Sequence, residues 1–558
     1  MAPIFSLLTS QLALTSPLTY TSSPAKHGAV ASESDICSRI GIDIFEVGGN
    51  AADSLVATTF CVGVVGMYHS GIGGGGFMVV RRSDGEYENI DFRETAPMAA
   101  DEDMFLGNVN GSIVSGLASG VPGELRGLQY LHENYGSLPW KALVKPAIKI
   151  ARFGWAVNAD LVRYMESATV SDDFLTNDPN WAIDFAPRGK RLALGETITR
   201  KRYADTLEKI AEDGPDVFYE GPMAQAMIDT LQAQNGSMTM ADLKNYTVAL
   251  RKPATINCRG QKLTSCSAPA SGIVALTVMN VISGYDNIGD PAVLNLSTHR
   301  LDEAMRFGYG MRTELGDPSF VPGMVEYQDS MISEETGEAI RKNISDTTTF
   351  PVAYYDPLGI ESLDTPGTSH VVTAEASGMA VSLTTTVNLL FGSKVVIPQT
   401  GVIMNNEMND FSIPNTTNAF GYAPSPANFV RAGKRPLSSI SPTIAEYANG
   451  SLAFIIGAAG GSRITTATIQ SLWFVLDRNM SVSEALVQSR LHDQLIPNQA
   501  AFEEGYDPST VEFMASLGHN VTIVPKGASA VQGIRVTGNG TFEAAGEPRQ
   551  KNSGGFAY

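Results

Sequence analysis

The chain has 558 residues, of which 43% are apolar and 17% charged, a composition typical of a well-packed globular protein. This length exceeds what one ordinary hydrophobic core holds, so it predicts two structural units or one large interwoven unit. The 39 basic and 58 acidic residues give a net charge of −19, which argues against nucleic acid and against an anionic membrane surface as partners.

The amino-terminal residues 1–27 are expected to be a poorly defined leader. The apolar stretch Ile4–Leu14 is interrupted by polar residues, has no basic residue before it and is too short to cross a membrane. No other apolar run in the sequence reaches spanning length, so we expect no transmembrane segment.

Other features indicate a secretory protein, either extracellular or vacuolar. Sequons of the N-x-S/T type occur at Asn110, Asn235, Asn245, Asn295, Asn343, Asn415, Asn449, Asn479, Asn520 and Asn539. They suggest surface loops that tolerate glycans, and the even number of cysteines, 4, fits the same compartment. Cys258 and Cys266 could bridge two strands, a pairing that the sequence leaves open. No C-x-x-C or histidine pairing suggests a metal site.

In chain order, residues 28–135 have an α/β pattern. Apolar periodicity predicts helices over residues 37–47, 51–65, 140–153, 203–211, 223–234, 465–478 and 483–488. The run Gly73–Gly76 lacks the residues of a phosphate-binding loop, so we expect it to let backbone pass close to another strand. Segment 335–367 is polar and contains three prolines, which predicts an irregular arm.

The residues from Gly367 onward predict a β-hairpin with a hydroxyl residue at its open end, opposite the turn. Strands are expected over His370–Glu375 and Met379–Val387. His370 should be a packed core residue or a support for the site residues rather than a catalytic base. A Thr after a Gly is where a chain can cut itself, because Gly leaves room for the strained backbone of an N→O acyl shift. After such a cut, Thr368 would carry both a hydroxyl and a free α-amine. The hydroxyl can act as a nucleophile and the amine as its general base. The simpler interpretation is that Thr368 only begins an edge strand.

Short motifs around and after this hairpin extend the interpretation. They are Thr368-Ser-His, Thr384-Thr-Thr-Val-Asn388, Phe391-Gly-Ser-Lys394, Asn405-Asn-Glu-Met-Asn-Asp-Phe-Ser412, Pro436-Leu-Ser-Ser-Ile-Ser-Pro-Thr-Ile444 and Gly457-Ala-Ala-Gly-Gly-Ser462, preceded by Gly71-Ile-Gly-Gly-Gly-Gly-Phe77 and Asp91-Phe-Arg-Glu-Thr-Ala-Pro97. In this order they resemble the γ-glutamyltransferase (γ-glutamyltranspeptidase, glutathione hydrolase) family of the eukaryotic type, over nearly the whole chain from about Gly28.

This resemblance implies a four-layer αββα N-terminal-nucleophile hydrolase that cleaves itself between Gly367 and Thr368. The large subunit would be residues 28–367 and the small subunit residues 368–558, intertwined as a heterodimer in one globule. The substrates implied are glutathione and related γ-glutamyl compounds, with water, an amino acid or a dipeptide as acceptor. No cofactor is implied, and Cys37 and Cys61 match a disulfide of eukaryotic relatives.

The resemblance also assigns roles to individual residues. The catalytic residues it implies are the nucleophile Thr368, its hydrogen-bonding partner Thr386 and the oxyanion-hole pair Gly460 and Gly461. The residues it implies for the α-carboxylate of the donor are Arg93, Ser438 and Ser439. Those it implies for the α-ammonium are Asn388, Glu407 and Asp410.

Two alternatives remain open at the level of the sequence. One is a related acylase for another acyl donor, such as a glutaryl β-lactam; Arg93, Glu407 and Asp410 argue against it, because a cradle for an ammonium is wasted on a substrate without an amine. The other is an inactive extracellular scaffold, which the intact Thr368 and Thr386 oppose.

Overall fold

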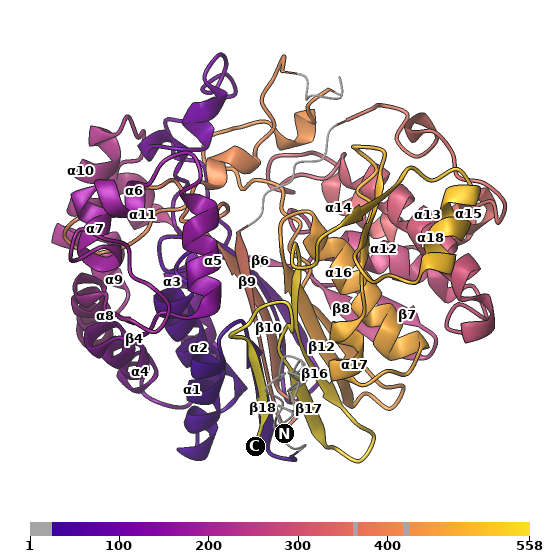
Figure 1. Cartoon of the computed structure of the whole chain (residues 1–558), viewed down its shortest axis with the longest axis horizontal. Helices are drawn as coiled ribbons and strands as arrows, with labels where there is room; N and C mark the ends of the chain where they lie inside the picture. Colours follow the sequence, from indigo (N-terminus) through magenta and orange to yellow (C-terminus); the bar gives the residue numbers. More distant parts are fainter. Residues whose placement is uncertain (1–24, 361–366, 417–422) are drawn as a thin grey trace, which may run out of the picture.

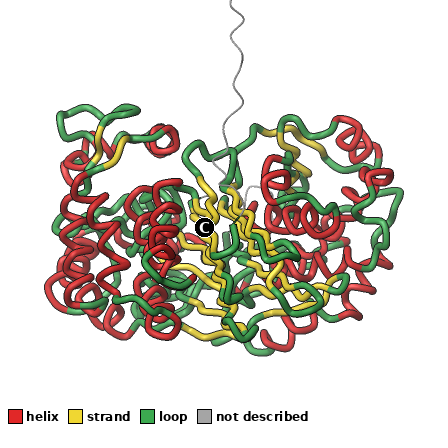
Figure 2. Tube along the Cα trace, turned by 90° about the horizontal axis from the view of Figure 1, so that it is seen from below, coloured by secondary structure: helices red, strands yellow, loops and turns green. Residues whose placement is uncertain are grey.

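The computed structural model describes residues 25–360, 367–416 and 423–558. Two antiparallel sheets lie face to face at the centre, and helices cover the outer side of each sheet (Figure 1). The view from below shows the same order, with strands between two groups of helices (Figure 2). This is the expected αββα sandwich.

The first sheet has seven strands and the second has six. In spatial order the first consists of β18 (Gly554–Ala557), β1 (Gly28–Ser32), β9 (Thr368–Glu375), β10 (Ala380–Thr386), β2 (Gly75–Arg81), β3 (Tyr87–Asp91) and β6 (Ala249–Arg251). The second consists of β17 (Phe542–Ala545), β16 (Ala530–Val536), β12 (Leu452–Ala459), β11 (Thr443–Glu446), β8 (Gln261–Ser265) and β7 (Ala254–Cys258). Small sheets are formed by β13 (Leu491–His492), β14 (Ala500–Glu503) and β15 (Val521–Val524), and by β4 (Trp155–Ala156) and β5 (Thr197–Ile198).

The helices fall into two groups, to the left and right of the sheets in Figure 1. The left group comprises α1 (Asp35–Glu46), α2 (Ala51–Val65), α3 (Glu124–Tyr135), α4 (Trp140–Phe153), α5 (Ala159–Ala168), α6 (Phe174–Asn177), α7 (Pro179–Phe185), α8 (Lys201–Asp213), α9 (Asp216–Tyr219), α10 (Gly221–Ala233) and α11 (Met240–Asn245). The right group comprises α12 (Gly272–Ser283), α13 (Leu294–Arg312), α14 (Met324–Met331), α15 (Glu334–Asn343), α16 (Arg463–Leu472), α17 (Val482–Val487) and α18 (Pro508–Ser516).

The central strands of the first sheet, β1, β2, β9 and β10, are buried on both faces. Successive side chains of a strand point to opposite faces. Val371 therefore packs in the core under the left helices, whereas Val372 packs in the core shared with the second sheet. Met78 and Phe77 on β2 divide in the same way. Such double coverage explains why β9 and β10 read as continuous β-branched runs rather than as alternating apolar and polar residues.

Both sheets combine strands from either side of Thr368. In the first sheet β9 lies between β1 and β10, and β1 also pairs with β18 at the carboxyl end of the chain. In the second sheet β8 pairs with β11. Two fragments divided at Thr368 would therefore share both sheets, so neither fragment would contain a complete sheet of its own.

Most predicted elements match the structure, and one expectation is wrong. Helices α2 and α4 have the predicted bounds, and the hairpin is β9 and β10. The predicted irregular arm, however, begins with helix α15, which Ser333 caps and which buries Ile340. Its low apolar content hid it, because only a narrow face of this helix is covered. Residues 361–366 of the predicted arm lie outside the described residues.

Cys37 and Cys61 form the predicted disulfide between α1 and α2. Cys258 and Cys266 are buried free thiols. Among the helices of the described residues, none has the length and apolar character needed to cross a membrane.

Candidate active site

Thr368 and Thr386 meet at one end of the hairpin. Thr368 is the first residue of β9, and the register pairs it with Thr386, the last residue of β10. The hydroxyl of Thr368 donates to Thr386 Oγ1 across 3.4 Å. Thr386 Oγ1 in turn donates to the carbonyl oxygen of Gly367 at 2.6 Å and accepts from the backbone N–H of Asn388 at 2.7 Å. The carbonyl before the candidate nucleophile is therefore already hydrogen-bonded.

Glycines allow the close packing that this arrangement needs. A Cβ atom on Gly367 would lie 2.3 Å from the carbonyl oxygen of Asn388. A Cβ atom on Gly74, in the predicted run of glycines, would lie 2.0 Å from the carbonyl oxygen of Thr386. Backbone thus passes as close to the candidate site as the sequence predicted, and no side chain fits at either position.

Gly460 and Gly461 follow β12 and lie next to Thr368. Both have positive φ angles, 122° and 63°, a conformation that favours glycine. Gly461 lines a first hollow together with Thr368, and Gly460 lines a second hollow together with Thr368. Within the described part of the chain, neither backbone N–H donates a hydrogen bond. Two such donors can stabilise a negative oxygen that develops near the nucleophile.

The six residues predicted to hold the donor lie together with Thr368 and Thr386. They line the first hollow and are Arg93, Asn388, Glu407, Asp410, Ser438 and Ser439. All six are buried. They come from the end of β3, the turn after β10, the 3₁₀ turn Glu407–Asp410 and the loop before β11, so the fold assembles the predicted set from four separate segments.

The guanidinium of Arg93 forms ion pairs with both Glu407 and Asp410. The volume left between these side chains is about 10 Å³, roughly the room that one water molecule needs. Burial raises the pKa of Glu407, although the charge of Arg93 opposes this shift. The structure therefore shows the candidate donor site closed, with the cation of Arg93 occupying the space between the carboxylates.

Some amide and hydroxyl groups of this site already form hydrogen bonds within the protein. Asn388 Nδ2 donates to the carbonyl oxygen of Asn406 at 3.0 Å, which leaves its amide oxygen as an acceptor. Ser439 Oγ accepts from Arg312 at 3.1 Å. Arg312 is a buried residue that the sequence did not indicate, because it lies on α13, more than 120 residues before its partner Ser439.

Two buried glutamates near the site were also not predicted from the sequence. Glu94 lies 4.0 Å from Arg93, and neither of its carboxylate oxygens has a hydrogen-bond partner among the described residues. Burial raises its pKa to about 8. Glu124 accepts a hydrogen bond from Thr385, the neighbour of Thr386, and burial raises its pKa to about 7. A single acidic residue next to an arginine or within a helix looks like an ordinary surface residue in one sequence, so its burial could not be predicted.

The expected core histidine His370 is fully enclosed. Its Nδ1 atom hydrogen-bonds Thr384 at 2.8 Å, and burial lowers its pKa to about 3. A Cβ atom on Gly457 would lie 2.2 Å from its ring. His370 is therefore a neutral packing residue two positions after Thr368 on β9.

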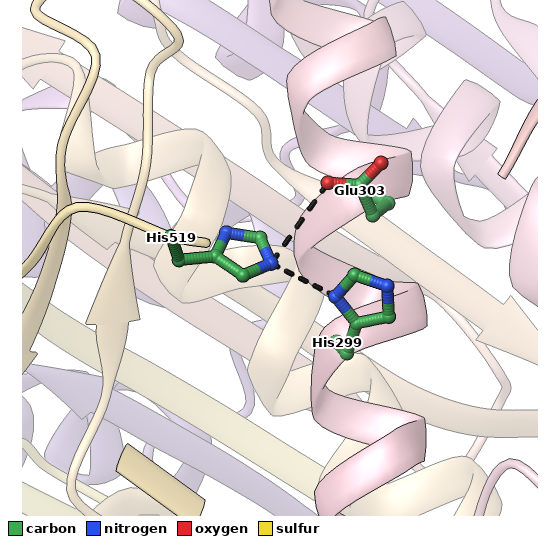
Figure 3. Close-up of side chains that lie close together, drawn as sticks. All are labelled: His299, Glu303 and His519. Carbon is green, nitrogen blue, oxygen red and sulfur yellow. Dashed lines mark hydrogen bonds and ion pairs between the residues drawn. The ribbon is translucent and has the colours of Figure 1, made fainter. Parts of the chain in front are cut away.

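A separate buried cluster joins α13 to the segment before residue 361. His299, Glu303 and His519 lie close together (Figure 3). His299 Nε2 donates to the Ser345 carbonyl oxygen at 2.7 Å, so its Nδ1 accepts from His519 at 2.8 Å. Tyr355 donates to Glu303 at 2.7 Å. These hydrogen bonds occupy the atoms that a metal ion would need, and they fasten the arm that leads toward Gly367.

Comparisons with known proteins agree with this geometry. The family model described as Gamma-glutamyltranspeptidase matches residues 37–557. The chain is 56% identical to a "Glutathione hydrolase proenzyme" of Arthroderma benhamiae, over 95% of this chain and 92% of that protein. It is 51% identical to a "Glutathione hydrolase" of Aspergillus flavus, over 95% and 90% of the two chains.

Solved structures show the same fold. A cephalosporin acylase from Bacillus halodurans superposes with a TM-score of 0.84 at 25% identity, covering 99% of each chain. The gamma-glutamyltranspeptidase of Helicobacter pylori superposes with a TM-score of 0.54 at 31% identity, covering 62% of this chain and 96% of that chain. On the match over nearly its whole length, the chain belongs to the gamma-glutamyltranspeptidase family.

Proposed function

We propose that this protein cleaves the γ-glutamyl amide bond of glutathione and related compounds through a γ-glutamyl ester on Thr368. The γ-glutamyl group then passes to water or to an amino acid or peptide acceptor. One observation carries this proposal: the hydroxyl of Thr368 adjoins a buried site that holds a guanidinium and two carboxylates. Such a set matches a donor head with one carboxylate and one ammonium.

The first step is self-cleavage. Thr368 Oγ attacks the carbonyl carbon of Gly367, and the negative charge develops on the oxygen to which Thr386 already donates. The bond between this carbon and the Thr368 nitrogen then breaks, and the nitrogen takes up the proton that the Thr368 hydroxyl has lost. Water hydrolyses the resulting ester, which releases the carboxyl end of Gly367 and leaves Thr368 with a free α-amine. The products are the large subunit, residues 28–367 with the leader, and the small subunit, residues 368–558.

The donor then enters the closed site. Its α-ammonium replaces the Arg93 guanidinium at Glu407 and Asp410, and its α-carboxylate pairs with Arg93 and the hydroxyls of Ser438 and Ser439. An ammonium brought beside Glu407 lowers the pKa of this carboxyl, so the donor favours the charged form that it needs.

The chemistry of turnover uses the groups freed by cleavage. The α-amine of Thr368 accepts the hydroxyl proton while Oγ attacks the δ-carbonyl carbon of the donor. The oxyanion is stabilised by the N–H groups of Gly460 and Gly461. The leaving amine takes the proton, and water or an acceptor amine attacks the ester by the reverse path.

The two alternative functions have less support. The cephalosporin acylase shares the fold at 25% identity, whereas the glutathione hydrolase of Arthroderma benhamiae shares 56%, and the carboxylate pair suits a substrate with an amine. The complete set of reacting groups opposes an inactive scaffold. The disulfide between Cys37 and Cys61 and the sequons support residence in the secretory pathway, extracellular or vacuolar.

The test is an assay of purified protein with glutathione, with and without glycylglycine. We expect release of cysteinylglycine in both cases and formation of γ-glutamyl-glycylglycine in the second. The variant Thr368→Ala should do neither. Cleavage of a glutaryl amide at a rate above that of glutathione would favour the acylase instead.

A further inference from the structure

The nucleophile lies between two hollows. The first is the small donor site of about 10 Å³, and the second is a larger hollow of about 280 Å³ that Thr368 also lines. Thr368 lines both hollows, Gly461 lines the first and Gly460 the second. When the γ-glutamyl head occupies the first hollow, the scissile amide lies at Thr368, and the second hollow adjoins this residue and offers room for the part of the donor beyond the amide.

Arg463 carries the one permanent charge among the described residues that line this second hollow. It is the first residue of α16, two positions after Gly461, and it is partly exposed. No hydrogen bond or ion pair of its guanidinium is present within the described part of the chain. The other arginines of this region differ: Arg93 pairs with Glu407, and Arg549 pairs with Glu503 at 2.5 Å.

An unpaired guanidinium beside a reaction centre has a chemical consequence. Its fork of N–H donors fits a carboxylate with two parallel hydrogen bonds. The dipeptide that leaves glutathione ends in a carboxylate, and so does a dipeptide acceptor that returns along the same route. A donor with an aromatic amine as leaving group has no carboxylate at this place.

We propose that Arg463 binds the free carboxylate of the peptide portion beyond the scissile amide, in the leaving dipeptide and in dipeptide acceptors alike. This inference rests on the proposed function. It adds a second charged contact between the protein and its substrates. Arg93 selects the γ-glutamyl head, and Arg463 selects small peptides with a free carboxyl end over amines that lack one.

The test compares substrates that differ only in this carboxylate. The donors are glutathione and γ-glutamyl para-nitroanilide, and the acceptors are glycylglycine and glycylglycine amide. The variants are Arg463→Gln and Arg463→Lys. The control is Arg82→Gln, which removes a half-exposed arginine that pairs with Asp84 on the surface. A denaturing gel first establishes that each protein is cleaved into two fragments.

For Arg463→Gln we expect kcat/KM for glutathione to fall about tenfold, the scale of one charge-assisted hydrogen bond, and the KM for glycylglycine to rise by a similar factor. Hydrolysis of the anilide should stay within about twofold of the unmodified protein. Arg463→Lys should recover part of the loss, and Arg82→Gln should change nothing. In the unmodified protein glycylglycine amide should be a weaker acceptor than glycylglycine, and this difference should vanish in Arg463→Gln.

Other outcomes separate the two hypotheses. If the unmodified protein cleaves neither glutathione nor the anilide, the proposed function is wrong and this inference falls with it. If it cleaves both donors and Arg463→Gln slows them equally, or slows neither, only the role of Arg463 is overturned. If Arg463→Gln is not cleaved into fragments, the decision rests on Arg463→Lys and on the acceptors: equal use of glycylglycine and its amide by the unmodified protein overturns the inference.

Discussion

The hydroxyl of Thr386 donates a hydrogen bond to the carbonyl oxygen of Gly367 at 2.6 Å, and the hydroxyl of Thr368 lies 3.4 Å from the same oxygen atom of Thr386. One side chain therefore contacts both the carbonyl that would be attacked and the group that would attack it. Because β10 ends at Thr386 and β9 begins at Thr368, the register of the hairpin sets this contact.

Replacing Thr386 should slow self-cleavage. Thr386→Val keeps the shape of the side chain but removes the donor to the Gly367 oxygen, and losing such a donor typically costs about 10²–10³ in rate. Thr386→Ser keeps the hydroxyl and should cleave at a rate close to that of the unmodified chain. The measurement is the appearance of the two fragments on a denaturing gel over time after synthesis. Equal rates for Thr386→Val and the unmodified chain would show that the hydrogen bond has no part in cleavage.

Changes in the donor site should separate binding from processing. Arg93→Lys replaces a planar fork by a point charge, so we expect the KM for the donor to rise at least tenfold. Asp410→Asn removes one anion facing the α-ammonium and should also raise this KM. Neither residue contacts Gly367, so both variants should still be cleaved into two fragments. Donor kinetics that stay unchanged in a fully cleaved variant would remove that residue from the site.

The sequence predicted the parts of this structure that depend on local order. The apolar run of α2 predicts a buried helix, and the β-branched runs that follow Thr368 predict buried strands. Both patterns are clear because an element that is covered on all sides tolerates few polar residues. The candidate site was predicted residue by residue only through a family resemblance. No local pattern indicates that Arg93 meets Glu407, which is 314 positions away in the chain.

Other features depend on tertiary packing and were missed for that reason. Helix α15 was assigned to an irregular arm, since its buried face is narrow. The pairing of β1 with β18 brings residues 29–32 next to residues 554–557, and only the complete sheet specifies it. The burial and the raised pKa values of single acids such as Glu94 and Glu124 are set by neighbours on other elements, which the sequence does not specify.

Glu124 should make stability depend on pH. Its pKa in the folded protein is about 7, above the ordinary 4.5, and burial is the cause. A carboxyl with a raised pKa contributes stability that is complete below its unfolded value and is lost as the pH rises through the folded value. Up to about 3 kcal/mol should therefore disappear between pH 4.5 and pH 7, on the conversion of one pKa unit to 1.4 kcal/mol.

The variant Glu124→Gln stays neutral at every pH and tests this linkage. Above pH 7 its thermal midpoint should exceed that of the unmodified protein, or at least fall less on going from pH 5 to pH 8. The exposed Glu133→Gln serves as the control, and its curve should run parallel to that of the unmodified protein. Parallel curves for Glu124→Gln as well would mean that Glu124 ionises normally despite its burial.

The most direct test of Thr368 as nucleophile is the mass of the small fragment during turnover. The purified protein is mixed with a γ-glutamyl donor, quenched in acid within milliseconds to seconds and measured by mass spectrometry. We predict a fragment that begins at Thr368 and gains the mass of one γ-glutamyl group on that residue, and a single uncleaved, inactive chain for Thr368→Ala. Donor cleavage by Thr368→Ala, or an acyl group on another residue, would contradict the assignment of Thr368.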